Sequence, residues 1–200
     1  MDLDFTPIIL PEDKLPQIEG EEYKKCEVYG QSPRIIWGEG NPKATIVVIL
    51  DNPGAREDKE GKEFICGTRQ TLQKAIFDAG INIDDVYITY LLKCRPLRRY
   101  DKIRAREFSK PFLIRQIKEI NPDFIVCLGD TVVQSMFDNN EAHVKNLRGT
   151  WHIIMGYQTV VSYHPLAVRR RPNLMKSFME DWEILSQRFL KRKLLGGNSE

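Results

Sequence analysis

Two short polar segments of this sequence carry side chains that could do chemistry, and each follows an apolar run. The tetrapeptide DNPG (51–54) comes directly after the run 44–50, and His164 follows a second run that ends at residue 162. Asp51 and Asn52 could position or activate a water molecule, while the Pro-Gly turn at Gly54 lets a ligand approach the backbone closely. The same four residues could instead form only an Asx turn, and both interpretations stay open.

His164 is the best candidate among three histidines, because His143 and His152 lie outside the segments that follow predicted strands. A histidine at a strand end could donate a hydrogen bond to developing negative charge, although a purely structural role is more common for a single histidine. Phe64, ten residues beyond the turn, could stack on a planar base or belong to the core.

The net charge of +2 conceals an uneven distribution. Residues 1–25 contain seven acidic residues and three lysines, whereas residues 93–106 contain seven basic residues and one aspartate. Three further arginines follow one another at 169–171. Such basic runs are either solvated loops or surfaces that contact the phosphate backbone of a nucleic acid.

Strand and helix patterns alternate along the chain and predict the elements that must position these residues. Strands are expected at short apolar runs between turn residues: 44–50, 86–92, 123–128, 151–155 and 159–162. Helices are expected where apolar residues recur every three or four positions: 68–79, 112–120, 130–137 and 174–190. Ser109 is a possible cap of the second helix, with Pro111 in its first turn.

This alternation predicts an α/β fold in which helices cover both faces of a mainly parallel sheet. A single domain is expected at 34–195, with an irregular acidic arm at 1–33 packed on it and a frayed tail at 196–200. Sites in such folds form at the carboxyl ends of the strands. Two of the four segments at those ends carry the basic runs, which favours a nucleic-acid ligand.

Composition excludes several classes of protein. The 200 residues are 42% hydrophobic and 29% charged, as in an ordinary globular domain. No apolar run reaches the roughly 18 residues of a membrane span, and the acidic N-terminus does not resemble a secretory signal. The four cysteines form no CxxC pair, which excludes a standard zinc ribbon. We expect a cytoplasmic monomer that binds no membrane.

Several motifs together, in this order, resemble the uracil-DNA glycosylase superfamily, most of all its family-4 enzymes. They are GEGNP (38–42), DNPG (51–54), EDKEGKEFICG (57–67), VYITYLLKCRP (86–96), RQIKEINPDFIVCLG (115–129), LRG (147–149) and HPLAVRRRP (164–172). The resemblance implies a three-layer α/β/α domain with a central, mainly parallel sheet. It also implies an enzyme of base excision repair that flips a base out of DNA and hydrolyses its N-glycosidic bond.

The resemblance further implies roles for single residues. Asp51 would stabilise the sugar cation and orient water, Asn52 would hold that water, and His164 would stabilise charge on the leaving base. Phe64 would stack on the flipped base, in a pocket with Gly54 and Tyr90. Contacts to the DNA would come from Lys93, Arg95, Arg98, Arg99, Arg169 and Arg170.

Two of these positions depart from the family pattern. Tyr90 stands where the family usually has an asparagine that reads the uracil edge, and a phenol cannot reproduce the paired donor and acceptor of an amide. Asp51 stands where family 4 usually has a glutamate, so its carboxylate is one methylene closer to the backbone.

The cysteines are the third departure. Family-4 enzymes hold a [4Fe–4S] cluster with four cysteines, and only Cys26 and Cys94 match ligand positions. Tyr23 and Phe108 occupy the other two positions. We therefore expect no metal and no cofactor, with the aromatic side chains filling the vacated site by packing.

Three hypotheses about function follow. The first is a DNA glycosylase that acts on uracil or on another deaminated or mismatched base. The second is a non-catalytic DNA-binding or damage-sensing protein on the same fold, which Tyr90 favours. The third is a hydrolase of nucleotides or phosphate esters, although the sequence has no GxxxxGK[ST] phosphate loop.

Overall fold

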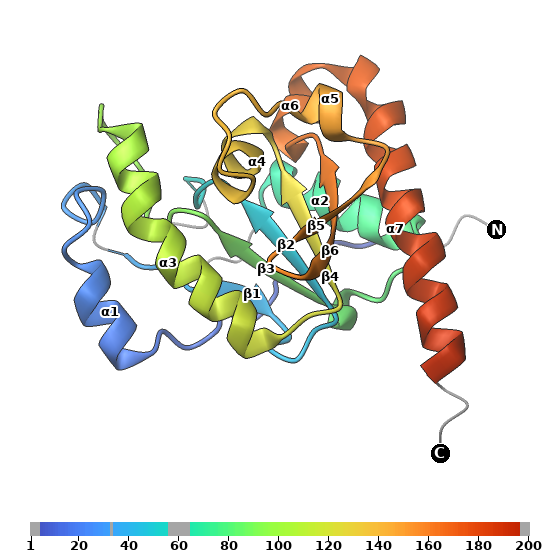
Figure 1. Cartoon of the computed structure of the whole chain (residues 1–200), viewed down its shortest axis with the longest axis horizontal. Coiled ribbons are helices and arrows are strands. Elements are labelled where there is room, and N and C mark those ends of the chain that lie inside the picture. The colour runs from blue at the N-terminus through green and yellow to red at the C-terminus, as the bar shows by residue number, and fades with distance from the viewer. Residues whose placement is uncertain (1–4, 33, 56–64, 197–200) are drawn as a thin grey trace.

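The computed structural model describes residues 5–32, 34–55 and 65–196. A six-stranded sheet in the order β1-β3-β2-β4-β6-β5 forms its centre (Figure 1). The inner strands are mutually parallel: β2 (Ile46–Leu50), β3 (Val86–Tyr90), β4 (Phe124–Leu128) and β6 (Tyr157–Ser162). The edge strands β1 (Gly38–Gly40) and β5 (Trp151–Ile154) run antiparallel to their neighbours.

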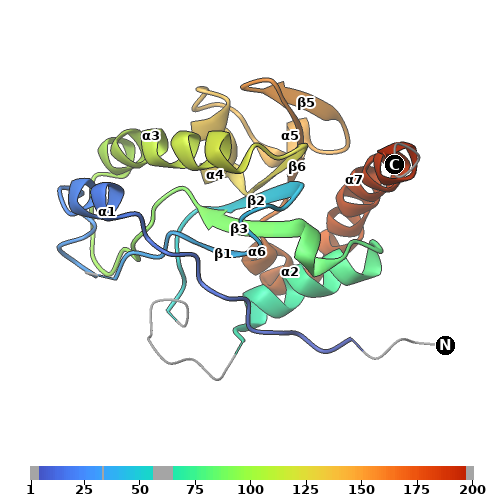
Figure 2. The same cartoon turned by 90° about the horizontal axis from the view of Figure 1, so that it is seen from below.

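Helices cover both faces of this sheet (Figure 2). One face carries α3 (Lys102–Ile120), α4 (Asp130–Met136) and α5 (Val144–Leu147). The other carries α2 (Gly67–Asp78), α6 (Pro165–Arg170) and α7 (Met175–Gly196). Two 3₁₀ turns, at Ile83–Asp85 and Pro172–Leu174, precede β3 and α7. The predicted three-layer α/β/α fold is therefore confirmed.

The inner strands are buried because both of their faces are covered. Every residue of β2, β3 and β4 is buried, as expected for parallel strands between two helical layers. Along β2, Val47 and Ile49 pack in the cluster that includes α3, whereas Val48 and Leu50 pack in the cluster with α2 and α7. This alternation leaves β2 without a solvent-facing side, so polar side chains can meet a ligand at the end of this strand.

The N-terminal segment packs along the edge of the sheet and contains a short helix, α1 (Gln17–Tyr23), where the sequence predicted an irregular arm. The backbone of Gly40 donates to the carbonyl of Pro11 at 2.9 Å. Nearer the N-terminus, the backbone N–H of Ile8 donates to Gln73 Oε1 on α2 at 2.9 Å, and Gln73 Nε2 donates to the Ile8 carbonyl at 2.8 Å. These bonds hold the segment against β1 and α2.

Helix α3 begins ten residues earlier than predicted, because Asp101 caps it. The Asp101 carboxylate accepts hydrogen bonds from the backbone of Ile103 and Arg104, both at 3.1 Å. Pro111 consequently lies inside the helix, and Ser109 is buried rather than a cap. The last five residues of the basic run 93–106 are therefore helical.

The chain ends differ from the prediction in a smaller way. Gly196, expected in a frayed tail, is the last residue of α7, and residues 197–200 lie outside the described part of the chain. Among the described residues, no helix is long and apolar enough to cross a membrane.

Candidate active site

The carboxyl ends of β2 and β6 bring Asp51 and His164 into contact, although β4 lies between the two strands. Asp51 Oδ1 lies 3.3 Å from His164 Nε2 and accepts a hydrogen bond from the backbone of Asn52 at 2.9 Å. Oδ2 takes part in neither contact. Burial alone would raise the pKa of Asp51, but the hydrogen bond and charge of His164, together with hydrogen bonds from the backbone of Asn52 and of Asp51 itself, outweigh burial and lower this pKa from its usual value. The carboxylate is therefore ionised at neutral pH.

The backbone fixes which nitrogen of His164 carries the proton. His164 caps the N-terminus of α6, and its Nδ1 accepts a hydrogen bond from the backbone of Leu166 at 3.1 Å. A ring nitrogen that accepts holds no proton, so in the neutral imidazole the proton sits on Nε2. Nε2 is also the ring nitrogen that lies 3.3 Å from Asp51 Oδ1.

Gly129 directly follows β4, and because it has no side chain it leaves space for His164. Its φ of +90° is one that residues with a side chain rarely adopt, and an added Cβ would lie 3.0 Å from the Cβ of His164. The ends of β2 and β6 thus supply a carboxylate and an imidazole at the same edge of the sheet. The glycine after β4 leaves space for the imidazole.

A pocket of about 450 Å³ opens beside this pair, within the usual range of about 300–1,000 Å³ for small-ligand pockets. Its lining comprises Leu50, Asp51, Asn52, Gly54, Thr68, Arg69, Tyr90, His164, Leu166, Ala167, Arg170 and Arg171. Five of the six predicted catalytic and base-binding residues therefore surround one space. The amide nitrogen of Asn52 donates to the carbonyl of Pro53 at 2.9 Å, which also fixes the turn. Phe64 lies outside the described residues.

Tyr90 is buried in the wall of this pocket, and two charged residues hold its hydroxyl group. The hydroxyl donates to Glu39 Oε1 at 3.1 Å and accepts from Arg69 Nη2 at 2.6 Å. Sequence reasoning missed both Arg69 and Glu39. The spacing of Arg69 could have indicated that it is buried, because it lies three and seven residues before Leu72 and Ile76 and so shares their buried helix face.

Lys93 lies in the core rather than at the surface. Its ammonium group contacts Gln116 Oε1 at 2.5 Å, Thr89 Oγ1 at 2.6 Å and the carbonyl of Trp37 at 3.1 Å. Burial lowers its pKa well below the usual value. A side chain with no exposed area cannot reach a phosphate, so the prediction that Lys93 contacts DNA is wrong.

The predicted basic residues otherwise lie on two stretches of surface. Arg98 and Arg99 are exposed on the loop after β3, and Arg95 on the same loop is half-buried. Arg170 is exposed on α6 and lines the pocket. Arg169 is also exposed, but its guanidinium donates to the carbonyl of Gly67 at 3.1 Å and so ties α6 to the start of α2.

The residues at the cluster-ligand positions do not fit a [4Fe–4S] cluster. Cys26 and Cys94 are buried, and the other two positions hold aromatic rings, with Tyr23 and Phe108 packed edge to face at 5.9 Å. The Tyr23 hydroxyl accepts from the backbone of Lys93 at 2.7 Å and pairs with Ser109 at 2.8 Å. Two thiols cannot replace four ligands. In the described part of the chain, no group of three or more His, Cys, Asp or Glu side chains could hold a metal ion.

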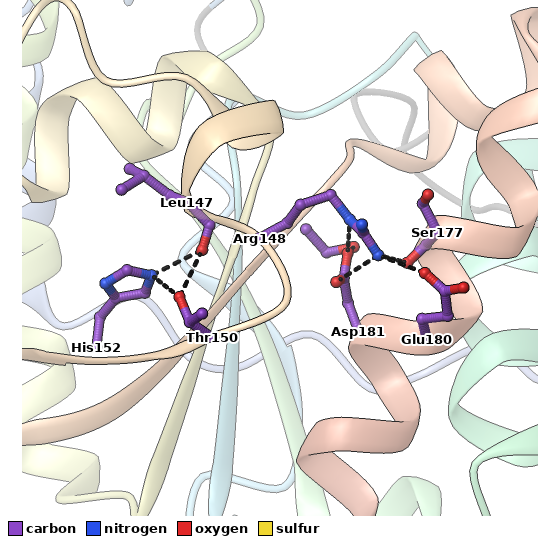
Figure 3. A network of polar contacts seen from close by, with 8 residues as sticks. Leu147, Arg148, Thr150, His152, Ser177, Glu180 and Asp181 are labelled. Carbon is purple, nitrogen blue, oxygen red and sulfur yellow. Dashed lines mark hydrogen bonds and ion pairs between the residues drawn. The ribbon is translucent and has the colours of Figure 1, made fainter.

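A polar network around the buried Asp181 fixes the strand that leads to His164 (Figure 3). Arg148 Nε donates to Asp181 Oδ2 at 3.1 Å, and its Nη2 reaches Glu180 and the carbonyl of Ser177 on α7. Ser162, at the end of β6, donates to the same Asp181 oxygen at 2.6 Å. The network therefore anchors the strand end two residues before His164. The His152 ring, by contrast, contacts the Leu147 carbonyl at 2.8 Å and has a structural role.

The fold and the pocket at the strand ends are those of an α/β enzyme, and comparison with known proteins narrows the class. The family model of the uracil DNA glycosylase superfamily matches residues 37–186. The chain therefore belongs to the uracil-DNA glycosylase superfamily. The predicted family and the predicted class of enzyme, a DNA glycosylase, are both confirmed.

Individual relatives agree with this assignment. The chain is 30% identical over 172 residues to a type-4 uracil-DNA glycosylase of Archaeoglobus fulgidus, covering 82% of this chain and 86% of that one. For the type-4 uracil-DNA glycosylase of Thermotoga maritima the identity is 32% over 190 residues, which cover 90% of this chain and 97% of the relative. For that of Saccharolobus solfataricus it is 35% over 187 residues, covering 88% and 86%.

Proposed function

We propose that this enzyme hydrolyses the N-glycosidic bond of uracil, or of another deaminated or mismatched base, in DNA, and so acts in base excision repair. The observation that carries the proposal is the contact between Asp51 and His164 at the mouth of one pocket. The similarity to type-4 uracil-DNA glycosylases over most of the chain supports the same substrate.

The charges of the pair suit the reaction. Cleavage of an N-glycosidic bond develops positive charge on the sugar and negative charge on the leaving base. The ionised Asp51 would stabilise the sugar and orient the attacking water, and the Nε2–H of His164 would donate to the base oxygen. The pocket would hold the base after it leaves the DNA stack.

DNA is the proposed macromolecular ligand. Arg170 and Arg171 at the pocket, with Arg98 and Arg99 on the loop after β3, are exposed and could neutralise phosphates on either side of the flipped nucleotide. Lys93 has no part in this. We also propose a cytoplasmic monomer built as a single domain, which gel filtration and cell fractionation would test.

We further propose that the enzyme works without an iron–sulfur cluster. The aromatic packing of Tyr23 with Phe108 and Phe112, at 5.9 and 5.2 Å, would take over the task of joining the N-terminal segment to α3. Freshly purified protein should show no visible absorption from iron–sulfur charge transfer and no bound iron by elemental analysis. Stoichiometric iron would overturn this part of the proposal.

The activity is tested with oligonucleotides that contain a single uracil, hypoxanthine or mismatched base, as duplexes and as single strands. Abasic sites are revealed by strand cleavage in alkali. We expect abasic product from at least the uracil substrate. If no substrate yields product while the protein still binds DNA in a salt-dependent way, the proposal fails and the non-catalytic alternative replaces it.

A further inference from the structure

A buried ion pair lies at the wall of the pocket. Arg69 Nη2 lies 2.7 Å from Glu39 Oε1, and the two side chains are only 6% and 11% exposed. Arg69 comes from the first turn of α2 and lines the pocket, whereas Glu39 on β1 does not. The pair therefore joins an edge strand to the helix that forms the pocket wall.

Tyr90 completes this arrangement from the end of β3. Its hydroxyl bonds to both members of the pair, as described above, and the Arg69 guanidinium lies 5.5 Å from the centre of its ring. Three buried side chains from three elements thus fix one another. The orientation of the guanidinium is set by contacts on two sides before any ligand arrives.

Stability alone gives no reason for a buried ion pair at this place. Removing two charges from water is unfavourable, and apolar residues of similar volume often stabilise a fold equally well or better. Arg69, unlike Glu39, belongs to the lining of the pocket. The arrangement is therefore better explained by what it presents to a ligand.

A guanidinium presents only hydrogen-bond donors. Deamination replaces the exocyclic amino group of cytosine or adenine, which donates, by a carbonyl oxygen, which accepts. A hydrogen-bond donor in the pocket wall would bond to the carbonyl oxygen of the deaminated base. With the unmodified base, the same donor would meet the amino group, which is also a donor, and no hydrogen bond could form. An unmatched buried donor is unfavourable by about 1–3 kcal/mol, and the middle of that range, about 1.4–2.7 kcal/mol, corresponds to roughly a tenfold to hundredfold preference.

We propose that Arg69 is a specificity-determining residue, which selects a base carrying a carbonyl oxygen over one carrying an exocyclic amine, and that Glu39 and Tyr90 are positioning residues that hold it. This inference rests on the proposed function, since it assigns the base selectivity of the same pocket.

The test separates base selection from cleavage. Oligonucleotides carry 2′-fluoro-2′-deoxyuridine or 2′-fluoro-2′-deoxycytidine at one position, because the electron-withdrawing fluorine opposes positive charge on the sugar and blocks hydrolysis. Binding of the full chain to both is measured by fluorescence anisotropy. We expect the wild type to prefer the uridine by at least about tenfold, and Arg69→Gln to lose most of that preference. Lys74→Gln, on an exposed position of the same helix, is the matched control and should keep it.

Further variants keep the inference testable if Arg69→Gln does not fold. Tyr90→Phe keeps the ring and both charges but removes the hydroxyl, and Glu39→Gln removes the negative charge behind Arg69. Each should reduce the preference by a smaller factor than Arg69→Gln. A wild type without preference, or folded variants that all retain it, would overturn the inference. If base preference depends on Arg69 but ordinary uracil is never excised, the inference stands and the proposed activity fails.

Discussion

Substituting Gly129 by alanine should reduce activity far more than its effect on stability explains. The backbone at this position has φ +90° and ψ 157°, a region that only glycine occupies readily, so alanine should cost about 1–3 kcal/mol of unfolding free energy. For a chain of this length each kcal/mol lowers the melting temperature by about 2–4 °C.

The larger effect comes from the added methyl group. It would lie 3.0 Å from His164 Cβ, whereas carbon atoms prefer a separation of about 3.5–4.0 Å. His164 would therefore shift by roughly 0.5–1 Å. Because its Nε2 is already 3.3 Å from Asp51, such a shift disturbs the pair, and a misplacement of this size can lower a rate by about 100-fold.

Gly156 offers a matched control for this experiment. Its φ is +87°, and an added Cβ there would meet nothing within 4 Å. Gly129→Ala and Gly156→Ala should both lose stability, measured by thermal melting, but only Gly129→Ala should lose kcat/KM on a uracil oligonucleotide. Equal activities for the two variants would refute the reasoning that Gly129 makes room for the imidazole of His164 and that this imidazole takes part in the reaction.

Three further predictions follow from the same structure. Because the pKa of Asp51 is lowered from its usual value in the folded protein, its charge is present at neutral pH and is lost only as pH falls through that lowered pKa. The pH profile of kcat/KM should therefore show no loss due to Asp51 between about pH 5 and 7, and a limb there that shifts to higher pH in Asp51→Glu would contradict this. The double substitution of Arg98 and Arg99 by alanine should reduce the slope of log K against log salt concentration for DNA binding by about one unit per arginine. Lys93→Met should leave this slope unchanged. Anisotropy titrations at several salt concentrations measure both slopes. Burial raises the pKa of Cys127 to about 12, so iodoacetamide at about pH 8 should leave this thiol unmodified in the folded protein, as peptide mass spectrometry would reveal.

The sequence was sufficient to predict the fold class, and it singled out both Asp51 and His164, which the structure brings together. Buried apolar runs such as 46–50 have few structural alternatives, and the rule that sites gather at strand ends directs attention to Asp51 and His164. The motif order supplied the family. The contact between Asp51 and His164 could not be derived from spacing, since it depends on β4 lying between their strands.

Other features depended on contacts between distant parts of the chain. Lys93 belongs to a strongly basic run, and only the packing of Trp37 and Gln116 around it reveals that its ammonium group is internal. Arg69 and Glu39 are 30 positions apart, so nothing in the local sequence indicates that they pair behind Tyr90. The early start of α3 was missed because its first turns are mostly polar and have no apolar periodicity.

The most direct test of the account is single-turnover excision of uracil from an oligonucleotide at neutral pH by the wild type and by Asp51→Asn. Asp138→Asn is the control, because Asp138 is exposed and its φ of +52° suits asparagine. We predict that wild type and control release uracil at the same rate, and that Asp51→Asn is slower by about 100-fold or more. A wild type that leaves uracil in place, or an Asp51→Asn variant as fast as the wild type, would contradict the assignment of Asp51 and His164 as the catalytic pair.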